Sequence, residues 1–357
     1  MARVLFGFLT LFALLALGVW LKFGGGNRYG DVNTAARLDA DAIERVFRYD
    51  QPIGDLAFSA DDTLFFSIHP AAQTNDNQVL RLSDGLATPF PDRSSQQQLF
   101  DTVAGLTIDN QDRLWVVDHG RFGFGQPRLM AFDVADGSIA FDLPFNADLA
   151  PKGSLLQDVA VSVDGQFAFV ADTSLWRESP ALLVVDLVNG NAQRLLVDHP
   201  ALSSQQWQIH NPDGDLTFLG GLLSLMPGVD ALSVSPDGQW LYLAAMSHDG
   251  VFRISLDEAA SGSIRPERYG DKPLTDAIVA APGGRIYLTD IEHTAILELD
   301  GRRRLSTLVQ TDQLRWPSAL ALDSNGDLYI ADAAVPLVLK PPLQGDPAPF
   351  SIYRLTL

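Results

Sequence analysis

The chain has 357 residues, 46% hydrophobic and 19% charged, a globular composition that excludes collagen, coiled coil and low-complexity polymer. Asp and Glu number 44 against 25 Lys and Arg, and the resulting net charge of −19 repels the phosphates of nucleic acids, so no nucleic-acid partner is expected. The absence of cysteine excludes disulfides, thiolate metal ligands and cysteine nucleophiles, which leaves oxygen and imidazole groups for any chemistry.

The first segment, Val4 to Leu21, is apolar and carries no charge. At about 1.5 Å per residue, a helix of this length just crosses a bilayer core of roughly 30 Å. The run ends in Gly-Val-Trp-Leu, which lacks the small-x-small pattern of a signal-peptidase site. We therefore expect residues 1–23 to be a signal anchor or signal peptide, with an uncleaved membrane anchor favoured. The rest of the protein would then lie on the exported, extracytoplasmic (periplasmic) side.

Residues 24–45 are expected to form a tether. They begin with the flexible sequence GGGNRYG and continue without long hydrophobic periodicity. The main domain is expected over residues 46–357.

One pattern recurs six times in the main domain. Each copy alternates apolar and polar residues, breaks at an Asp, Asn or Gly turn, and resumes with β-forming residues. The copies are residues 55–69, 104–118, 158–172, 230–244, 276–290 and 318–332. Each copy predicts a β-hairpin, and their spacing is close to the length of one propeller blade.

The sequence therefore predicts an all-β, six-bladed β-propeller preceded by an N-terminal hydrophobic helix. Radial repetition lets many short antiparallel strands avoid long open edges. We expect the segment Val46–Asp50 to close the ring by joining the last blade. The longest interval between copies contains an insertion over residues 197–227, which is expected to cover one face.

The repeats resemble the major royal jelly protein and yellow family, in the family's order, over about residues 100–357. The matching phrases are RLWVVDHGR from 113, PRLMAFDVADG from 127, LQDVAVSVDGQFAFVADTS from 156, SPDGQWLYLAAMSHDGVFRI from 235, TDAIVAAPGGRIYLTD from 275 and WPSALALDSNGDLYIAD from 316. The resemblance implies a six-bladed propeller with a ligand pocket at one end of its channel. Members include food proteins, amine binders and proposed dopachrome-converting enzymes, so the fold alone does not select a function.

Acidic residues mark both ends of the hairpins, and we expect them to share one face of the propeller. The hairpins begin with Asp55, Asp158, Asp230 and Asp276, and they end with Asp118, Asp172, Asp290 and Asp332. Eight crowded carboxylates require protonation, hydrogen bonds or a cation. For the four end residues a structural function, capping the following turn, is the favoured interpretation.

The four hairpin-start residues are candidate metal ligands. The gluconolactonase and senescence-marker family is similar in drawing divalent-metal ligands from the inner strands of four blades, which implies Asp55, Asp158, Asp230 and Asp276 here. Oxygen ligands favour calcium, magnesium or manganese. A metal-dependent lactonase or esterase is the alternative function, with Asp172 or Asp290 as general base and His119 assisting proton transfer.

A second hypothesis is a site for an organic amine, whose ammonium pairs with a carboxylate while its ring stacks on an aromatic side chain. The candidates are Asp118, Arg121 and Trp176, the last in an expected exposed loop. Nucleotide and haem motifs are absent from the sequence, so neither cofactor is expected. The sequence predicts a propeller that binds a small ligand, amine or lactone-like, or a divalent cation at an acidic channel mouth.

Overall fold

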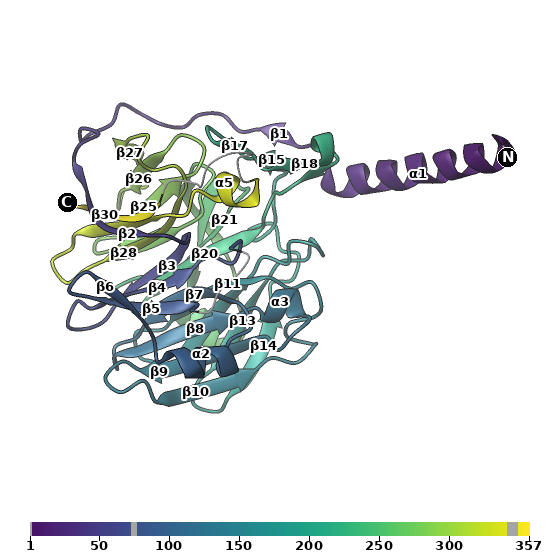
Figure 1. Cartoon of the computed structure of the whole chain (residues 1–357). Helices are drawn as coiled ribbons and strands as arrows, with labels where there is room; N and C mark the ends of the chain where they lie inside the picture. The colour runs from purple at the N-terminus through teal and green to yellow at the C-terminus, as the bar shows by residue number, and fades with distance from the viewer. Residues whose placement is uncertain (1, 73–76, 341–348) are drawn as a thin grey trace.

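The computed structural model describes residues 2–72, 77–340 and 349–357, and it confirms the six-bladed β-propeller with an N-terminal apolar helix (Figure 1). Blade 1 consists of β3 (Ile53–Phe58), β4 (Leu64–Ile68), β5 (Val79–Ser83) and β6 (Leu86–Pro89). Blade 2 consists of β7 (Val103–Ile108), β8 (Arg113–Asp118), β9 (Arg128–Asp133) and β10 (Ile139–Pro144). Blade 3 consists of β11 (Leu156–Val161), β12 (Phe167–Asp172), β13 (Ala181–Asp186) and β14 (Asn191–Leu195). Blade 4 consists of β20 (Val229–Val234), β21 (Trp240–Ala245), β22 (Gly250–Ser255) and β23 (Glu267–Asp271). Blade 5 is β24 (Ile278–Ala281), β25 (Arg285–Asp290), β26 (Ala295–Leu299) and β27 (Leu305–Gln310).

The sixth blade combines both ends of the chain. It contains β28 (Pro317–Leu322), β29 (Leu328–Asp332) and β30 (Phe350–Leu355), with β2 (Ile43–Tyr49) as its outer strand. The strand β2 pairs antiparallel with β30, which closes the ring. The prediction that Val46–Asp50 closes the ring is confirmed, with a strand that begins earlier, at Ile43.

The first strands of neighbouring blades contact one another in a ring around the channel. Apolar side chains fill each of the six junctions between blades. The hairpin turns follow the sequence pattern: Gly165 and Gly238 adopt φ angles of +69° and +70°, a conformation that costs glycine little. Burial of apolar surface at the six junctions stabilises the ring.

The propeller has two faces, which we name from the inner strands. The strand-start face is the one on which β3, β7, β11, β20, β24 and β28 begin, and the turn face carries their hairpin turns. Three short helices, α3 (Gly120–Gly123), α5 (Val335–Leu339) and the single-turn helix η1 (Leu219–Gly221), lie on loops of the strand-start face. The helix α2 (Arg93–Leu99), which connects β6 to β7, also lies on this face, whereas α4 (Leu256–Ser261) connects β22 to β23 on the turn face.

The insertion in blade 4 covers part of the strand-start face, as expected. Its short strands are β15 (Trp207–Gln208), β16 (His210–Asn211), β17 (Gly214–Asp215), β18 (Thr217–Phe218) and β19 (Leu223–Ser224). Ile209 and Leu216 from the insertion pack with Leu274, Ile291 and Trp316 from blades 5 and 6. The insertion therefore has its own apolar contact with the propeller body.

The N-terminal region consists of α1 (Ala2–Phe23) and a segment that runs along the propeller. The expected flexible tether is instead docked: β1 (Asn27–Arg28) pairs parallel with β15, and the Tyr29 hydroxyl donates to the Lys272 carbonyl at 3.0 Å. Leu38 packs against the junction of blades 5 and 6. Glycine content alone does not predict this, because the contacts depend on tyrosine, leucine and backbone groups between the glycines.

Candidate functional site

A cavity of about 340 Å³ occupies the central channel. All six inner strands line it. It extends from Gly54, Gln157 and Asp230 at the strand-start side to Val163 and Pro236 in the hairpin turns, where both of these residues are exposed. The four predicted metal ligands, Asp55, Asp158, Asp230 and Asp276, all line this cavity.

β-Bulges place the acidic side chains. The ladder between β3 and β4 shifts register between Ile53 and Leu56, and the ladder between β20 and β21 shifts between Val229 and Ala231. An extra residue in a bulge bends the strand locally and changes the direction of a side chain. Asp55 and Asp230 lie inside these two bulges, so the irregular start of the inner strand is what positions them at the channel.

Two of the four carboxylates bind the backbone of the next blade. Asp55 accepts from its neighbour Leu56 N at 2.8 Å and from Leu106 N of blade 2 at 2.7 Å. Asp158 repeats this pattern, accepting from Leu232 N of blade 4 at 2.6 Å. These two carboxylates therefore connect blades as well as line the cavity.

The other two carboxylates are less fully bonded. Asp276 Oδ2 accepts from Trp316 Nε1 at 2.5 Å. Asp230 Oδ1 lies 3.5 Å from the Thr173 hydroxyl, and Asp230 Oδ2 is buried with no hydrogen-bond partner. Gln157 Oε1, which also belongs to a residue lining the cavity, is likewise buried without a partner. After burial, which raises the pKa of Asp230, side-chain interactions with Asp276 and Gln157 lower it, so this carboxylate is not isolated within the cavity.

The four carboxylates affect one another's protonation. Burial raises the pKa of Asp55 and of Asp230 to about 6. Burial, followed by repulsion from Asp55, raises the pKa of Asp158 well above its ordinary value, and burial followed by repulsion from Asp230 does the same for Asp276. Removing a carboxylate from water disfavours its charged form, and a like charge nearby adds to the effect.

The channel side chains offer oxygen donors of the type that a divalent cation prefers. Carboxylate and amide oxygens are the ligands that calcium and magnesium prefer, and the unsatisfied oxygens of Asp230 and Gln157 have free lone pairs. No three of the four carboxylates bring oxygens within 4.8 Å of one another. A cation here would therefore take part of its coordination shell from water, as calcium commonly does.

The eight acidic residues do not surround one opening, because the four hairpin-end residues lie outside the cavity. Asp118 accepts from the backbone N–H groups of Asp101, Thr102 and Gly120 at 2.6, 2.9 and 2.7 Å. Asp332 accepts from Trp316 N at 2.7 Å and pairs with Arg315. Capping of the neighbouring loops, the favoured interpretation from the sequence, describes both residues.

The two candidate general bases, Asp172 and Asp290, are also buried and accept hydrogen bonds from nearby residues. Asp172 is fully buried, accepts from the backbone of Leu155 and Ser174 at 2.9 Å each, and pairs with Arg194 at 2.5 Å. Asp290 is also fully buried and accepts from the backbone N–H groups of Glu292 and His293 at 3.0 Å each. Neither lines the channel cavity. These contacts favour a structural function over proton transfer from a bound ligand.

His119, Arg121 and Trp176 lie on loops of the strand-start face, away from the four channel carboxylates. His119 is 1% exposed, and its Nδ1 accepts from Phe122 N at 2.9 Å, which orders the loop. Burial lowers the pKa of His119 to about 4. Arg121 pairs with Asp101 at 3.3 Å, and the Trp176 ring is exposed, as expected. They do not form one pocket with Asp118.

Sequence reasoning missed several residues near the cavity. Gln157 precedes Asp158, but its unsatisfied oxygen depends on the bulge and on burial. Lys272 is fully buried, and its ammonium donates to the carbonyls of Pro273 and Met246 at 2.9 and 3.3 Å. Burial lowers the pKa of Lys272 to about 7, and its charge favours the ionised form of Asp230. No local sequence pattern identifies a buried lysine.

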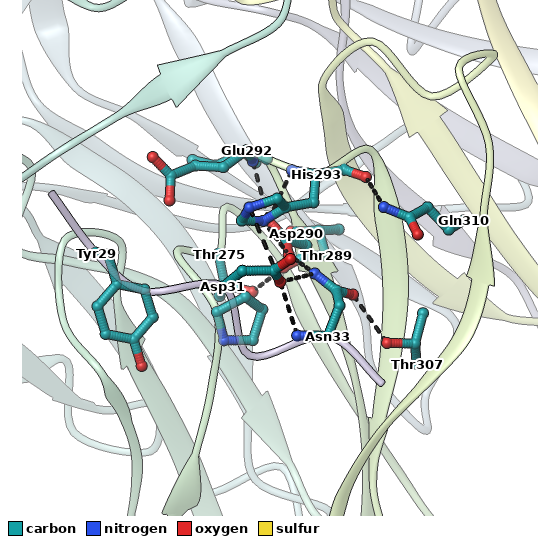
Figure 2. Close-up of polar contacts among 12 residues, drawn as sticks. Tyr29, Asp31, Asn33, Thr275, Thr289, Asp290, Glu292, His293, Thr307 and Gln310 are labelled. Carbon is teal, nitrogen blue, oxygen red and sulfur yellow. Dashed lines mark hydrogen bonds and ion pairs between the residues drawn. The ribbon is translucent and has the colours of Figure 1, made fainter. Parts of the chain in front are cut away.

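One tighter group of acidic and imidazole side chains occurs where the N-terminal segment meets blade 5. Asp31, Asp290 and His293 have ligand atoms within 4.8 Å of one another, the one such group of three among the described residues. Figure 2 shows Asp31 and Asn33 of the N-terminal segment beside Asp290 and His293. Asn33 Nδ2 donates to Asp290 Oδ2 at 2.7 Å, and His293 Nδ1 lies 2.9 Å from the same oxygen. The group is internally hydrogen-bonded and fastens the segment.

Fold and site together define a six-bladed β-propeller with an acidic central channel. A family model described as major royal jelly protein matches residues 102–355, and the chain belongs to this family. No curated protein sequence matches the chain.

Solved structures of the same fold include enzymes and a calcium-binding protein. A gluconolactonase from Xanthomonas campestris has a TM-score of 0.58 and 16% identity, with 88% of this chain and 89% of that chain covered. A calcium-binding protein, regucalcin, from Agrobacterium tumefaciens has a TM-score of 0.57 and 16% identity, with 90% and 95% covered. A luciferin-regenerating enzyme has a TM-score of 0.59 and 12% identity, with 88% and 94% covered. At these identities the likeness shows the fold.

Proposed function

We propose that this chain is an exported, membrane-anchored propeller that binds a divalent cation, calcium by preference, in its central channel. The observation that carries the proposal is the cluster of four buried carboxylates on one cavity, in which Asp230 Oδ2 and the nearby Gln157 Oε1 accept no hydrogen bond from a backbone N–H group. Leaving buried polar atoms unsatisfied costs free energy, and a cation bound by these oxygens removes that cost. It also offsets the repulsion among the carboxylates.

The channel residues would contribute to cation binding in different ways. Asp55 and Asp158 are fixed by backbone N–H groups of the next blade, so they supply negative charge at constant positions. Asp230 and Gln157 offer free oxygen lone pairs. Trp316 fixes one oxygen of Asp276, whose side chain also interacts with Asp230. When bound, the cation would supply positive charge that polarises a ligand oxygen entering from the turn face.

We favour a cation over an organic amine as the ligand because the tryptophan side chains near the carboxylates are buried. Trp316 touches Asp276 but is 1% exposed, and Trp115 is fully buried. An aromatic amine needs an exposed ring beside the carboxylate. Among the described residues lining the cavity, Phe58 is the one phenylalanine, tyrosine or tryptophan.

Export and anchoring are supported by α1. It contains the window Phe6–Phe23, with a mean hydropathy of 2.0, and none of this window is buried against the protein. Exposing so long an apolar helix to water is unfavourable, and a bilayer removes that cost. A signal sequence near the N-terminus has the same features, and N-terminal sequencing of the purified protein distinguishes the two.

Calorimetry on the metal-stripped full chain in detergent tests the cation site. Calcium and manganese are titrated into the wild type, Asp230→Asn and Asp257→Asn. Asp257 is an exposed residue of α4, so its variant loses the same charge at a distance from the channel. We expect one-site binding in the wild type and in Asp257→Asn, and its loss in Asp230→Asn. Absence of binding in the wild type, or equal binding in all three proteins, would contradict the proposal.

A metal-dependent lactonase on the same cavity is the second candidate. The observation in its favour is His69, which lines the cavity and whose pKa burial lowers to about 4, so that it is neutral at pH 7. The bases expected from the sequence, Asp172 and Asp290, do not line the cavity. Hydrolysis of gluconolactone by the calcium-loaded protein, lost in His69→Gln with cation binding retained, would support this activity.

A further inference from the structure

Exposed aromatic side chains gather on one face of the propeller. Outside α1, the exposed phenylalanine and tryptophan side chains in the described part of the chain are Phe122, Phe124 and Trp176, with 37%, 70% and 40% of their surface accessible. All three belong to loops that follow β8 and β12 on the strand-start face. The Phe122 and Trp176 rings have centroids 6.5 Å apart. They form one patch, which we name the aromatic patch.

The backbone beneath the aromatic patch is strained. Arg121 and Phe122 both adopt left-handed conformations, with φ of +49° and +60°, between Gly120 and Gly123, which are also left-handed. Each non-glycine residue in this region costs on the order of 1 kcal/mol. The loop is held by backbone bonds from Gly125 N to Gly120 O at 2.7 Å and from Gly153 N to Phe122 O at 2.8 Å. The fold thus stabilises a conformation that exposes two phenylalanines.

The apolar helix leaves the propeller beside this patch. Lys22 and Phe23, at the end of α1, line a cavity of about 150 Å³ together with Trp176, Leu223 and Met226. Pairing of β1 with β15 fixes the chain directly after the helix. In Figure 1, α1 projects to the right from the side on which α3 lies, whereas the C-terminus lies on the left.

The position of the aromatic patch beside the end of α1 determines its depth relative to a bilayer that α1 crosses. A helix of the length of α1 is about 33 Å long at 1.5 Å per residue, so when it crosses a bilayer its last residue, Phe23, lies at the interface. Trp176 shares a cavity with Phe23 and therefore lies at the same level. Tryptophan is the residue most typical of that level, where its ring contacts both lipid and water.

Basic residues accompany the aromatic patch in an otherwise acidic domain. Arg121 and Arg177 lie on the same loops, and Lys152 lies on the loop between β10 and β11, where its ammonium is 6.0 Å from the Phe124 ring centroid. The acidic residues nearby include Asp101, which pairs with Arg121, Glu178, and Asp148, which is exposed on the loop that carries Lys152. Basic and aromatic side chains together match the phosphate and upper acyl layers of a phospholipid bilayer.

We propose that the edge of the strand-start face that carries the aromatic patch docks on the phospholipid bilayer that α1 crosses, with Phe122, Phe124 and Trp176 inserted at the interface. This inference rests on the anchoring by α1 proposed above and extends it to a second, separate contact. Leu219 in η1, 79% exposed and beside β19, which contacts α1, extends the same surface. In this orientation the exposed turn-face end of the channel points away from the membrane. Ligands would therefore enter the channel from the aqueous phase.

Spin labelling of the full chain tests the docking, since the chain contains no cysteine of its own. Single variants Phe124→Cys, Val188→Cys and Leu14→Cys are labelled with a nitroxide and reconstituted in phosphatidylcholine/phosphatidylglycerol vesicles. Val188 is 74% exposed in the β13–β14 turn on the turn face, and Leu14 is 60% exposed in α1. The readout is the accessibility of each label to oxygen, which concentrates in lipid, relative to a water-soluble nickel chelate.

We expect the ratio of oxygen accessibility to nickel-chelate accessibility at position 124 to exceed the ratio at position 188 and to approach the ratio at position 14. An aqueous ratio at 124 with a lipid ratio at 14 would overturn the docking and leave the anchor intact. Exclusion of both relaxants at 124 would indicate a protein partner and also overturn it. An aqueous ratio at 14 would overturn the anchor and the docking together.

Discussion

Trp316 Nε1 donates a 2.5 Å hydrogen bond to Asp276 Oδ2, linking the start of blade 6 to a carboxylate of blade 5 at the channel wall. The tryptophan is 1% exposed, so its ring packs in the body of the propeller while its N–H faces the site. One side chain therefore contributes to the core and also holds a carboxylate oriented toward the cavity.

Replacing this tryptophan should weaken folding and cation binding together. Trp316→Phe removes the hydrogen bond to Asp276, and a typical hydrogen bond stabilises a protein by about 1 kcal/mol. Trp115→Phe is the matched control, because Trp115 is also buried and donates at 2.7 Å to Asp109, which lines the turn-face end of the cavity and is not one of the four candidate ligands. Urea unfolding should show similar losses in both variants, while calorimetry should show weaker calcium binding in Trp316→Phe alone. Equal calcium affinities would contradict the assignment.

The channel carboxylates should differ in what they contribute to stability. Asp55→Asn loses an acceptor for one of two backbone N–H groups, so the free energy of unfolding without metal should fall by about 1–2 kcal/mol. Asp230→Asn removes a charge that repels its neighbours and has one unsatisfied oxygen, so stability should stay constant or rise. Urea unfolding of the metal-free proteins measures both. A large loss in Asp230→Asn would show that this carboxylate is structurally required.

Stabilisation by calcium should depend on pH. The pKa of Asp55 and Asp230 is about 6 in the folded protein, against about 3.9 for an unfolded aspartate. The folded state therefore binds more protons between these values, and the metal-free protein loses stability as pH rises from about 4 to about 6. Above that range the carboxylates are charged and a cation restores stability. Thermal unfolding should show a larger calcium-induced increase in Tm at pH 7.5 than at pH 5, and no such difference in Asp230→Asn.

The N-terminal segment should loosen at alkaline pH. The hydrogen bond to Asp290 raises the pKa of His293, whose other acidic neighbours are Asp31 and Glu292. A raised folded-state pKa gives stability that is full below the unfolded value of about 6.5 and is lost as pH rises through the folded value. Amide exchange of residues 31–38, corrected for its intrinsic pH dependence, should therefore increase between pH 6 and pH 9. In His293→Gln the increase should be absent, and an unchanged profile would rule out this histidine as the cause.

The blades could be predicted from the sequence because their signals are local. Alternation of apolar and polar residues, and glycine or aspartate at the turns, depend on neighbours a few positions apart. The six hairpins and the closing strand near Val46 follow from such patterns, as does the capping function of Asp118. The positions of Asp55, Asp158, Asp230 and Asp276 along the channel also followed, since each opens an inner strand.

Tertiary structure decided the properties on which function depends. The bulges that aim Asp55 and Asp230, and the burial that leaves Asp230 Oδ2 and Gln157 Oε1 without partners, arise when strands from different blades meet. The docking of residues 27–38, expected to be a tether, depends on side chains of blade 5 that lie more than 250 positions away, such as His293. A linear pattern records the order of residues, whereas protonation and exposure follow from distances between residues that are remote in that order.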